Sequence, residues 1–222
     1  MVVTLMDNYN RNLVIVNDQD EIIGTKKALN AHLLNSLTLH RAFSVFIFNH
    51  ENKLMIQKRA QSKLVYPGLW SNTCCSHPFL NINSFSSPVD DCINHGVLRL
   101  QHELNINVKK EDFIFYERML YKATNEESFF RFLGKDVNKG EIKEYEDKET
   151  LQWKNKGTEN YGEYEVDYLF LIKKDVEYAI NPTEVEECRF VNYYELEELA
   201  LKNELTPWFA MIFNNLNIFK MI

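Results

Sequence analysis

Five side chains of the kinds that bind transition metals occur in three short segments of the sequence. His32 and His40 flank one link, and His77 follows two cysteines in the motif CCSHP. Glu163 and Glu165 are two residues apart in GEYEVDY, so in a strand both carboxylates would lie on one face. Three imidazoles and two carboxylates suit a divalent transition ion such as Zn²⁺ or Mn²⁺. A single histidine is more often a surface or core residue, so this prediction depends on the complete set.

The motif CCSHP also contains a candidate acid–base group. In an extended loop Cys75 and His77 point the same way, which places a thiol beside a metal ligand. A nearby cation lowers the pKa of a thiol and makes it usable in proton transfer. The alternative is a structural zinc site, but the adjacent Cys74 and Cys75 lack the spacing usual for zinc ligands. We favour a catalytic role for Cys75, and we expect Cys92 and Cys188 to be ordinary buried thiols.

Basic residues form a third candidate group. Arg59 and Lys63 precede the PGLW turn, and Arg99 lies in a stretch with helical spacing. Arginine binds phosphate oxygens with two parallel hydrogen bonds, so the three residues are candidates for holding a diphosphate. Glu103 follows Arg99 by four positions and would share its helix face, where a carboxylate could bind Mg²⁺ against the same phosphates. Taken alone, Arg99 and Glu103 predict only a helical salt bridge.

The first part of the chain predicts the strands that would position these groups. Residues 41–48 (RAFSVFIF) have the aromatic and β-branched composition of a buried strand. A strand at 53–59 follows a short polar turn, which predicts a hairpin. Residues 13–16 and 21–23 are a second pair of short strands, and 32–40 is expected to be a partly helical link.

Three helices have recognisable start signals. Ser87 and Thr206 each precede a proline, and Asn192 begins a capping box with Glu195. The final helix is predicted from apolar residues at steps of three and four: Trp208, Ile212, Leu216 and Phe219. Further strands are expected at 113–123, 163–172 and 188–191. The irregular alternation of strands and helices favours an α+β fold over a solenoid or a bundle.

The overall composition is that of a globular protein. The 222 residues carry a net charge of −7 and are 45% hydrophobic. An acidic chain is a poor partner for nucleic acid, and no apolar run reaches the roughly 18 residues of a membrane span. Because the sequence has neither a disulfide pattern nor a signal-like N-terminus, we expect a cytoplasmic monomer or weak dimer that acts on a small molecule.

One segment differs from the rest in composition. Residues 135–159 include 13 charged residues among 25. Such a segment buries too little apolar surface to offset the entropy of ordering it. We therefore predict a single domain over residues 1–222, interrupted by a charged, solvated insertion at about 125–160.

Four motifs occur in the order LHRAFSVFIFN, PGLWSNTCCSHP, GEYEVDY and TPWF. Together they resemble the type 1 isopentenyl-diphosphate Δ-isomerases, a family of the Nudix-fold superfamily. The resemblance covers about residues 13–124 and 162–216. It implies an α+β fold, namely a Nudix-like α-β-α sandwich with a mixed sheet. It also implies an enzyme of isoprenoid biosynthesis that converts isopentenyl diphosphate to dimethylallyl diphosphate through a tertiary carbocation.

The resemblance also implies roles for individual residues. Cys75 is the catalytic thiol, because the family's cysteine lies two residues before the histidine. The other residues at the reacting carbons are Glu165, Tyr121 and Trp208. The tightly bound Zn²⁺ or Mn²⁺ would be held by His32, His40, His77, Glu163 and Glu165. Glu103 would bind Mg²⁺ together with the diphosphate, and the substrate-binding residues would be Lys27, Arg59, Lys63, Ser76 and Arg99.

The sequence departs from the family pattern at two places. The family's substrate-binding lysine lies four residues before the first metal histidine, where this sequence has Ala28. The neighbouring residues Lys26 and Lys27 precede that position, and one of them could take the role; Lys27 is our candidate. The charged insertion between Tyr121 and Glu163 is much longer than the family's usual loop.

Two other functions are compatible with parts of this pattern. A Nudix hydrolase would need a cluster of helix carboxylates around Mg²⁺, but RLQHELNI has Arg99 and His102 where such an enzyme has glutamates. Glu103 alone cannot form that cluster. A non-enzymatic, zinc-stabilised interaction module would use Cys75 and the histidines only as structural ligands.

Overall fold

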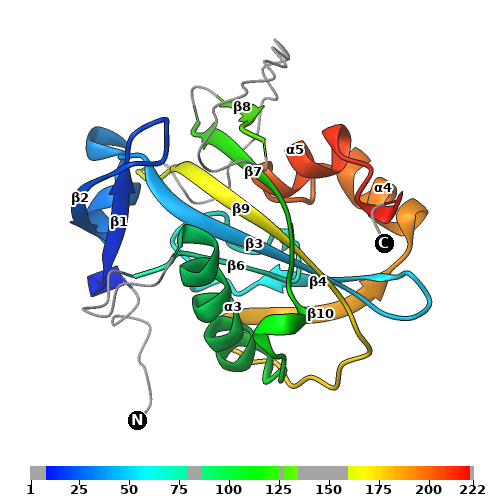
Figure 1. The fold of residues 1–222 in the computed structure, drawn as a ribbon. Helices are drawn as coiled ribbons and strands as arrows, with labels where there is room; N and C mark the ends of the chain where they lie inside the picture. The colour runs from blue at the N-terminus through cyan, green and yellow to red at the C-terminus, as the bar shows by residue number, and fades with distance from the viewer. Residues whose placement is uncertain (1–8, 80–86, 126–127, 135–159, 221–222) are drawn as a thin grey trace.

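A computed structural model describes residues 9–79, 87–125, 128–134 and 160–220 of the chain. Its centre is a mixed sheet in which β3 and β9 are parallel and the other neighbouring strands are antiparallel (Figure 1). The strands along the sheet are β10 (Val185–Val191), β4 (Leu54–Arg59), β3 (His40–Phe48), β9 (Glu163–Lys173), β7 (Ile114–Ala123) and β8 (Ser128–Phe132). The helices are α2 (Ala28–His32), α3 (Pro88–Leu104), α4 (Tyr193–Leu201) and α5 (Pro207–Asn215).

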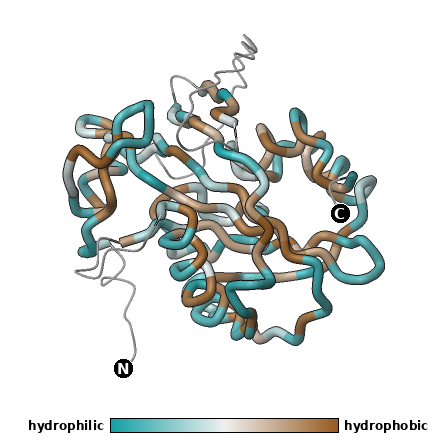
Figure 2. The backbone as a smooth tube through the Cα atoms, in the orientation of Figure 1, coloured by the Kyte–Doolittle hydropathy of each residue, from teal (hydrophilic) through white to brown (hydrophobic). Residues whose placement is uncertain are grey.

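Both faces of β3 are buried, and each packs against a different helix. Phe43, Val45 and Ile47 lie in one hydrophobic cluster with apolar residues of α3. Phe46 and Phe48 lie in another with apolar residues of α5. Figure 2 shows the hydrophobic stretches that run along the central strands. The helices therefore cover opposite faces of the sheet, which is the α-β-α sandwich that was predicted.

The predicted hairpin of β3 and β4 forms, but its strands separate soon after the turn. Among the described residues one register pair joins them, Phe48 with Leu54. The space between them is filled by the next segment of the chain, where β5 (Trp70–Ser71) pairs with β4 and β6 (Cys74–Ser76) pairs with β3. Thr73 bridges the opening, because its Oγ1 accepts from Ile47 N at 2.9 Å and donates to Met55 O at 2.6 Å. The segment with the two cysteines is thus held inside the sheet.

The helix start signals are confirmed, with one difference at α5. The Ser87 side chain accepts from Asp90 N, and Asn192 and Glu195 form the expected capping box. Thr206 stands before Pro207 but its side chain makes no cap hydrogen bond. The last helix is also shorter than predicted. It ends at Asn215, so Leu216 is its C-cap and Phe219 lies in a separate 3-10 turn (Ile218–Lys220).

The N-terminal strand pair is confirmed as β1 (Asn12–Val16) and β2 (Ile22–Lys27). Asn17 closes its turn by accepting from Gln19 N and Glu21 N. The link that follows is partly helical as expected, with α2 and a 3-10 turn (Leu34–Ser36).

Two expectations about the rest of the chain need correction. Cys92 is fully buried as predicted, but Cys188 is only half-buried because β10 lies at the edge of the sheet. The region 125–160, predicted as an insertion, includes β8, which pairs with β7. The charged part of that prediction, 135–159, lies outside the described residues. Among the described residues, no helix is long and apolar enough to cross a membrane.

Candidate active site

The five predicted metal ligands meet at one end of the β3–β9 pair. His32 ends α2, His40 begins β3, and His77 follows β6. Glu163 and Glu165 point to the same face of β9, and Glu165 lies opposite His40 in the register of the two strands. One ligand atom of each residue lies within 4.8 Å of all the others. The sequence prediction of this cluster is therefore supported by the placement of all five side chains.

Two of the imidazoles are fixed so that one nitrogen faces the cluster. His32 Nδ1 lies 2.6 Å from Ala28 O, and His40 Nδ1 lies 2.7 Å from Thr38 O. A carbonyl oxygen only accepts, so each Nδ1 carries the proton and donates. Each Nε2 then faces the other ligands, as it does when a second partner orients a metal-binding histidine.

The cluster also contains buried polar atoms that a cation would satisfy. His40 Nε2 is 3.4 Å from Glu165 Oε1, and Glu163 Oε2 is 3.1 Å from His32 Nε2. Within the described part of the chain, neither His40 Nε2 nor Glu163 Oε2 makes a hydrogen bond of acceptable geometry. Buried polar atoms in this condition are costly unless they bind an ion. Nitrogen and carboxylate donors at this spacing fit a divalent transition ion.

The pKa values of the cluster in the absence of an ion also support a metal site. Burial alone would raise the pKa of Glu165, but the neighbouring imidazoles of His40 and His77 outweigh it and hold that pKa well below its usual range. Burial raises the pKa of Glu163. Burial alone would lower the pKa of His32, but the Glu163 carboxylate outweighs it and raises that pKa to about 9. In the absence of an ion, His32 therefore keeps a proton at neutral pH that a bound ion would displace.

The two adjacent cysteines lie on opposite faces of the sheet. Cys74 is fully buried in the hydrophobic cluster under α3. Cys75 faces a pocket on the α5 side that Glu165 and Tyr121 also line. Burial raises the pKa of the Cys75 thiol to about 12, although Arg59 opposes this. Cys75 is therefore a neutral thiol in this structure.

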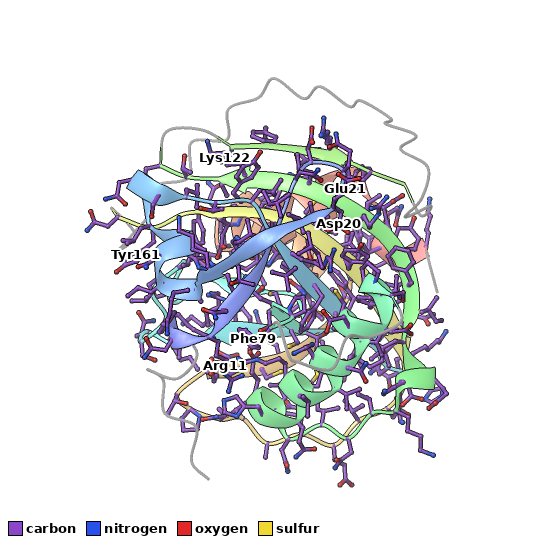
Figure 3. The ribbon with its side chains drawn as sticks, turned by 60° about the vertical axis from the view of Figure 1, so that its left-hand side comes forward. Arg11, Asp20, Glu21, Phe79, Lys122 and Tyr161 are labelled. Carbon is purple, nitrogen blue, oxygen red and sulfur yellow. The ribbon has the colours of Figure 1, made fainter. Side chains whose placement is uncertain are left out.

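Two aromatic side chains, Tyr121 and Trp208, line the same pocket as Cys75. The Tyr121 hydroxyl donates to Glu165 Oε2 at 2.5 Å. The Trp208 ring lies 6.4 Å from the Tyr121 ring, and the Arg59 guanidinium lies 5.3 Å from the Trp208 ring centre. All of these side chains line the same pocket. At its rim, Phe79 lies beside Arg11, whose guanidinium is 4.8 Å from the Phe79 ring centre (Figure 3).

The three predicted phosphate-binding residues line this pocket, but each already has an acceptor. Arg59 donates to the backbone oxygens of Val65 and Tyr66. Lys63 forms an ion pair with Glu184, and Arg99 NH2 lies 3.4 Å from the same carboxylate. Glu184 is 2% exposed. The segment NPTEVEE does not indicate that Glu184 pairs with these basic residues, because they come from other parts of the chain.

The remaining predicted residues are less directly connected with the pocket. Ser76 lines it. Glu103 is buried, pairs with Arg99, and accepts from Gln57 Nε2 at 3.0 Å. Lys27 Nζ donates to Asn10 O at 3.0 Å, and it is the next residue, Ala28, that lines the pocket. The roles of Glu103 and Lys27 remain predictions.

Comparison with known proteins shows the family to which the chain belongs. The chain is 34% identical over 214 residues to the isopentenyl-diphosphate Δ-isomerase of Schizosaccharomyces pombe, covering 89% of this chain and 78% of the relative. It is 33% identical over 213 residues to isopentenyl-diphosphate Δ-isomerase 1 of Bos taurus, covering 90% and 79%. The chain belongs to the isopentenyl-diphosphate Δ-isomerase family. No family model matches it.

The fold of this Δ-isomerase family member is also found among solved structures. DR0079 from Deinococcus radiodurans matches with a TM-score of 0.56 and 14% identity, covering 93% of this chain and 99% of that one. A Nudix hydrolase from M. smegmatis, RenU, matches with a TM-score of 0.41 and 12% identity, covering 83% and 89%. The predicted α+β fold with a mixed sheet is confirmed.

Proposed function

We propose that this chain converts isopentenyl diphosphate to dimethylallyl diphosphate, with Cys75 and Glu165 as the groups that transfer protons. One observation carries the proposal. A thiol and a carboxylate that come from different strands line one pocket, together with Tyr121 and Trp208. Moving a double bond requires a proton to be added at one carbon and removed from another, so two such groups are needed.

An alkene is a weak base, so its protonation needs a positioned acid and gives a tertiary cation. Tyr121 donates to Glu165 Oε2 in the structure, which makes these two residues a connected proton path. Cys75 enters the reaction as a neutral thiol and is the second group that can exchange a proton. A divalent ion held by the three histidines, Glu163 and Glu165 would supply positive charge that orients Glu165. We propose Zn²⁺ or Mn²⁺ there, and Mg²⁺ with the diphosphate at Glu103.

Water would trap the cation as an alcohol, so the pocket must exclude it. Leu64, Val65 and Trp208 supply apolar wall. The face of an indole also attracts a cation, by about 1–2 kcal/mol when water is absent. The diphosphate would be held at the other end by Arg59, Lys63, Arg99 and Ser76, with Lys27 as a further candidate.

Hydrolysis of a diphosphate is the second function compatible with the fold. It would need several carboxylates around Mg²⁺ and a water molecule. In α3, the one predicted metal carboxylate, Glu103, is buried and pairs with Arg99. His102 Nε2 lies 3.3 Å from Glu184. This arrangement favours isomerisation over hydrolysis.

Incubation of the purified protein with isopentenyl diphosphate and Mg²⁺ tests the proposal. We expect dimethylallyl diphosphate, which is separated from the substrate by its acid lability. Release of phosphate without isomer would support a hydrolase. Neither product, from protein shown to contain its metal, would support the interaction module.

We also propose that the protein is cytoplasmic and acts as a monomer or weak dimer on a small-molecule diphosphate. All four cysteines are free thiols, which suits a reducing compartment.

Trp208→Phe should lower turnover per folded molecule by about tenfold, which corresponds to about 1.4 kcal/mol. Phenylalanine keeps most of the packing of this buried residue but offers a weaker π-face to the cation. We expect the free energy of unfolding to fall by no more than about 1–2 kcal/mol. Turnover and thermal stability are measured on the same sample, and unchanged turnover would remove Trp208 from the mechanism.

A further inference from the structure

Asn72 lies between β5 and β6, is fully buried, and is absent from the pocket lining. Its Oδ1 is 3.1 Å from Trp208 Nε1 and 3.3 Å from Cys75 Sγ. Both of these atoms can donate a hydrogen to the carbonyl oxygen of Asn72. Ser71 Oγ lies 3.2 Å from the same oxygen and 3.1 Å from Cys75 Sγ, so it belongs to the same hydrogen-bonded group. We propose that Asn72 is a positioning residue that holds the Cys75 thiol and the Trp208 indole in one fixed arrangement. This inference rests on the proposed function of the pocket.

The orientation of the Asn72 amide is determined by its other contacts. Nδ2 donates to Cys74 O at 2.9 Å and to Val45 O at 3.2 Å. A flipped amide would place its oxygen against these two carbonyl oxygens and its NH₂ group against the indole N–H. The carbonyl oxygen must therefore face Cys75 and Trp208.

The contact joins two walls of the pocket that lie far apart in the sequence. Cys75 belongs to the segment inside the opened hairpin, whereas Trp208 is in the first turn of α5. Backbone hydrogen bonds from Trp70 N to Glu204 O and from Thr206 N to Trp70 O, both 2.8 Å, bring α5 next to β5. These backbone bonds set the position of the helix. Asn72 contacts both side chains, whereas the hydrogen bond of Ser71 Oγ reaches Cys75 Sγ.

Because Asn72 lies behind the pocket, its loss should affect the reaction more than substrate binding. Misplacement of a catalytic group by about 1 Å can cost roughly 100-fold in rate. For Asn72→Leu, which has nearly the same shape but no polar atoms, we expect kcat to fall by about 30- to 100-fold while KM stays within about twofold.

Thr73→Val is the matched control. Thr73 is fully buried, as Asn72 is. Its side chain bridges β3 and β4 through Ile47 N and Met55 O. Within the described residues, the Thr73 side chain makes no hydrogen bond to Cys75 or Trp208. We expect Thr73→Val to lower the melting temperature but to keep kcat within about threefold of the wild type. A purely structural role of Asn72 would make the two variants alike in turnover per metal-loaded molecule.

The Trp208 indole provides a readout that is independent of activity. In ¹H–¹⁵N spectra its Nε1–H signal, assigned with Trp208→Phe, should exchange slowly with solvent in the wild type. The signal should move in Asn72→Leu and in the smaller variant Asn72→Ser, but not in Thr73→Val. Wild-type exchange as fast as that of a free indole would overturn the proposal, as would wild-type kcat in either Asn72 variant. If the indole behaves as expected but wild-type protein forms no dimethylallyl diphosphate, the contact is correct and the proposed function is wrong.

Discussion

Cys75→Ala should lower isomerase turnover by about 10³-fold or more, with the fold and the metal content unchanged. The thiol lines the pocket and is one of the two groups proposed to transfer a proton, a role typically worth 10²–10⁴-fold. Its side chain is only half-buried, so its removal leaves the hydrophobic clusters intact. Product formation is followed with isopentenyl diphosphate and Mg²⁺, and circular dichroism checks the fold.

The neighbouring thiol is the matched control for this experiment. Cys74→Ala removes a buried sulfur from the cluster under α3, so it should cost about 1 kcal/mol of stability but leave turnover within about threefold. An inactive Cys74→Ala together with an active Cys75→Ala would show that the wrong thiol has been assigned.

Removal of the tightly bound ion should abolish activity and also lower the melting temperature. An ion that binds the native state and not the unfolded chain stabilises the native state by mass action. After dialysis against a chelator, Zn²⁺ or Mn²⁺ with Mg²⁺ should restore both properties, whereas Mg²⁺ alone should not. Full activity in protein shown by elemental analysis to contain no metal would contradict the metal proposal.

The affinity for this ion should also depend on pH. The pKa of His32 is raised to about 9 in the absence of metal, and a protonated imidazole cannot bind an ion. Below pH 9 the ion must displace that proton, so affinity should rise with pH up to about 9 and fall as the solution is acidified. Competition titrations with a chelator at several pH values measure this. An affinity that does not change with pH would show that His32 is not a ligand.

Features that depend on nearby residues were predicted well from the sequence. The caps at Ser87 and Asn192 follow from residue type and spacing within one turn. The two glutamates of β9 were placed on one face by the alternation of side chains in a strand. The residue types of the five metal ligands indicated their common chemistry, although not their distances.

Features that depend on distant contacts were missed. The sequence indicated a plain hairpin at β3 and β4, because nothing in either strand shows that a third segment enters between them. The sequence does not single out Asn72, since its partner Trp208 is 136 positions away. Glu184 has partners on two other elements and no motif of its own. These residues act through contacts between segments that are distant in the sequence, and local sequence patterns do not reveal such contacts.

The contacts of Glu184 have a consequence for charge balance in the pocket. Three positive charges come from Arg59, Lys63 and Arg99. Two negative charges come from Glu103 and Glu184, which pair with Arg99 and Lys63. These five groups together carry about one net positive charge, which is less than a diphosphate ester brings in negative charge. A bare diphosphate would leave this half-buried region with an excess of negative charge, at a high cost in a medium of low dielectric constant. We therefore expect a diphosphate to bind here together with a divalent counter-ion, and we expect the free anion to bind weakly.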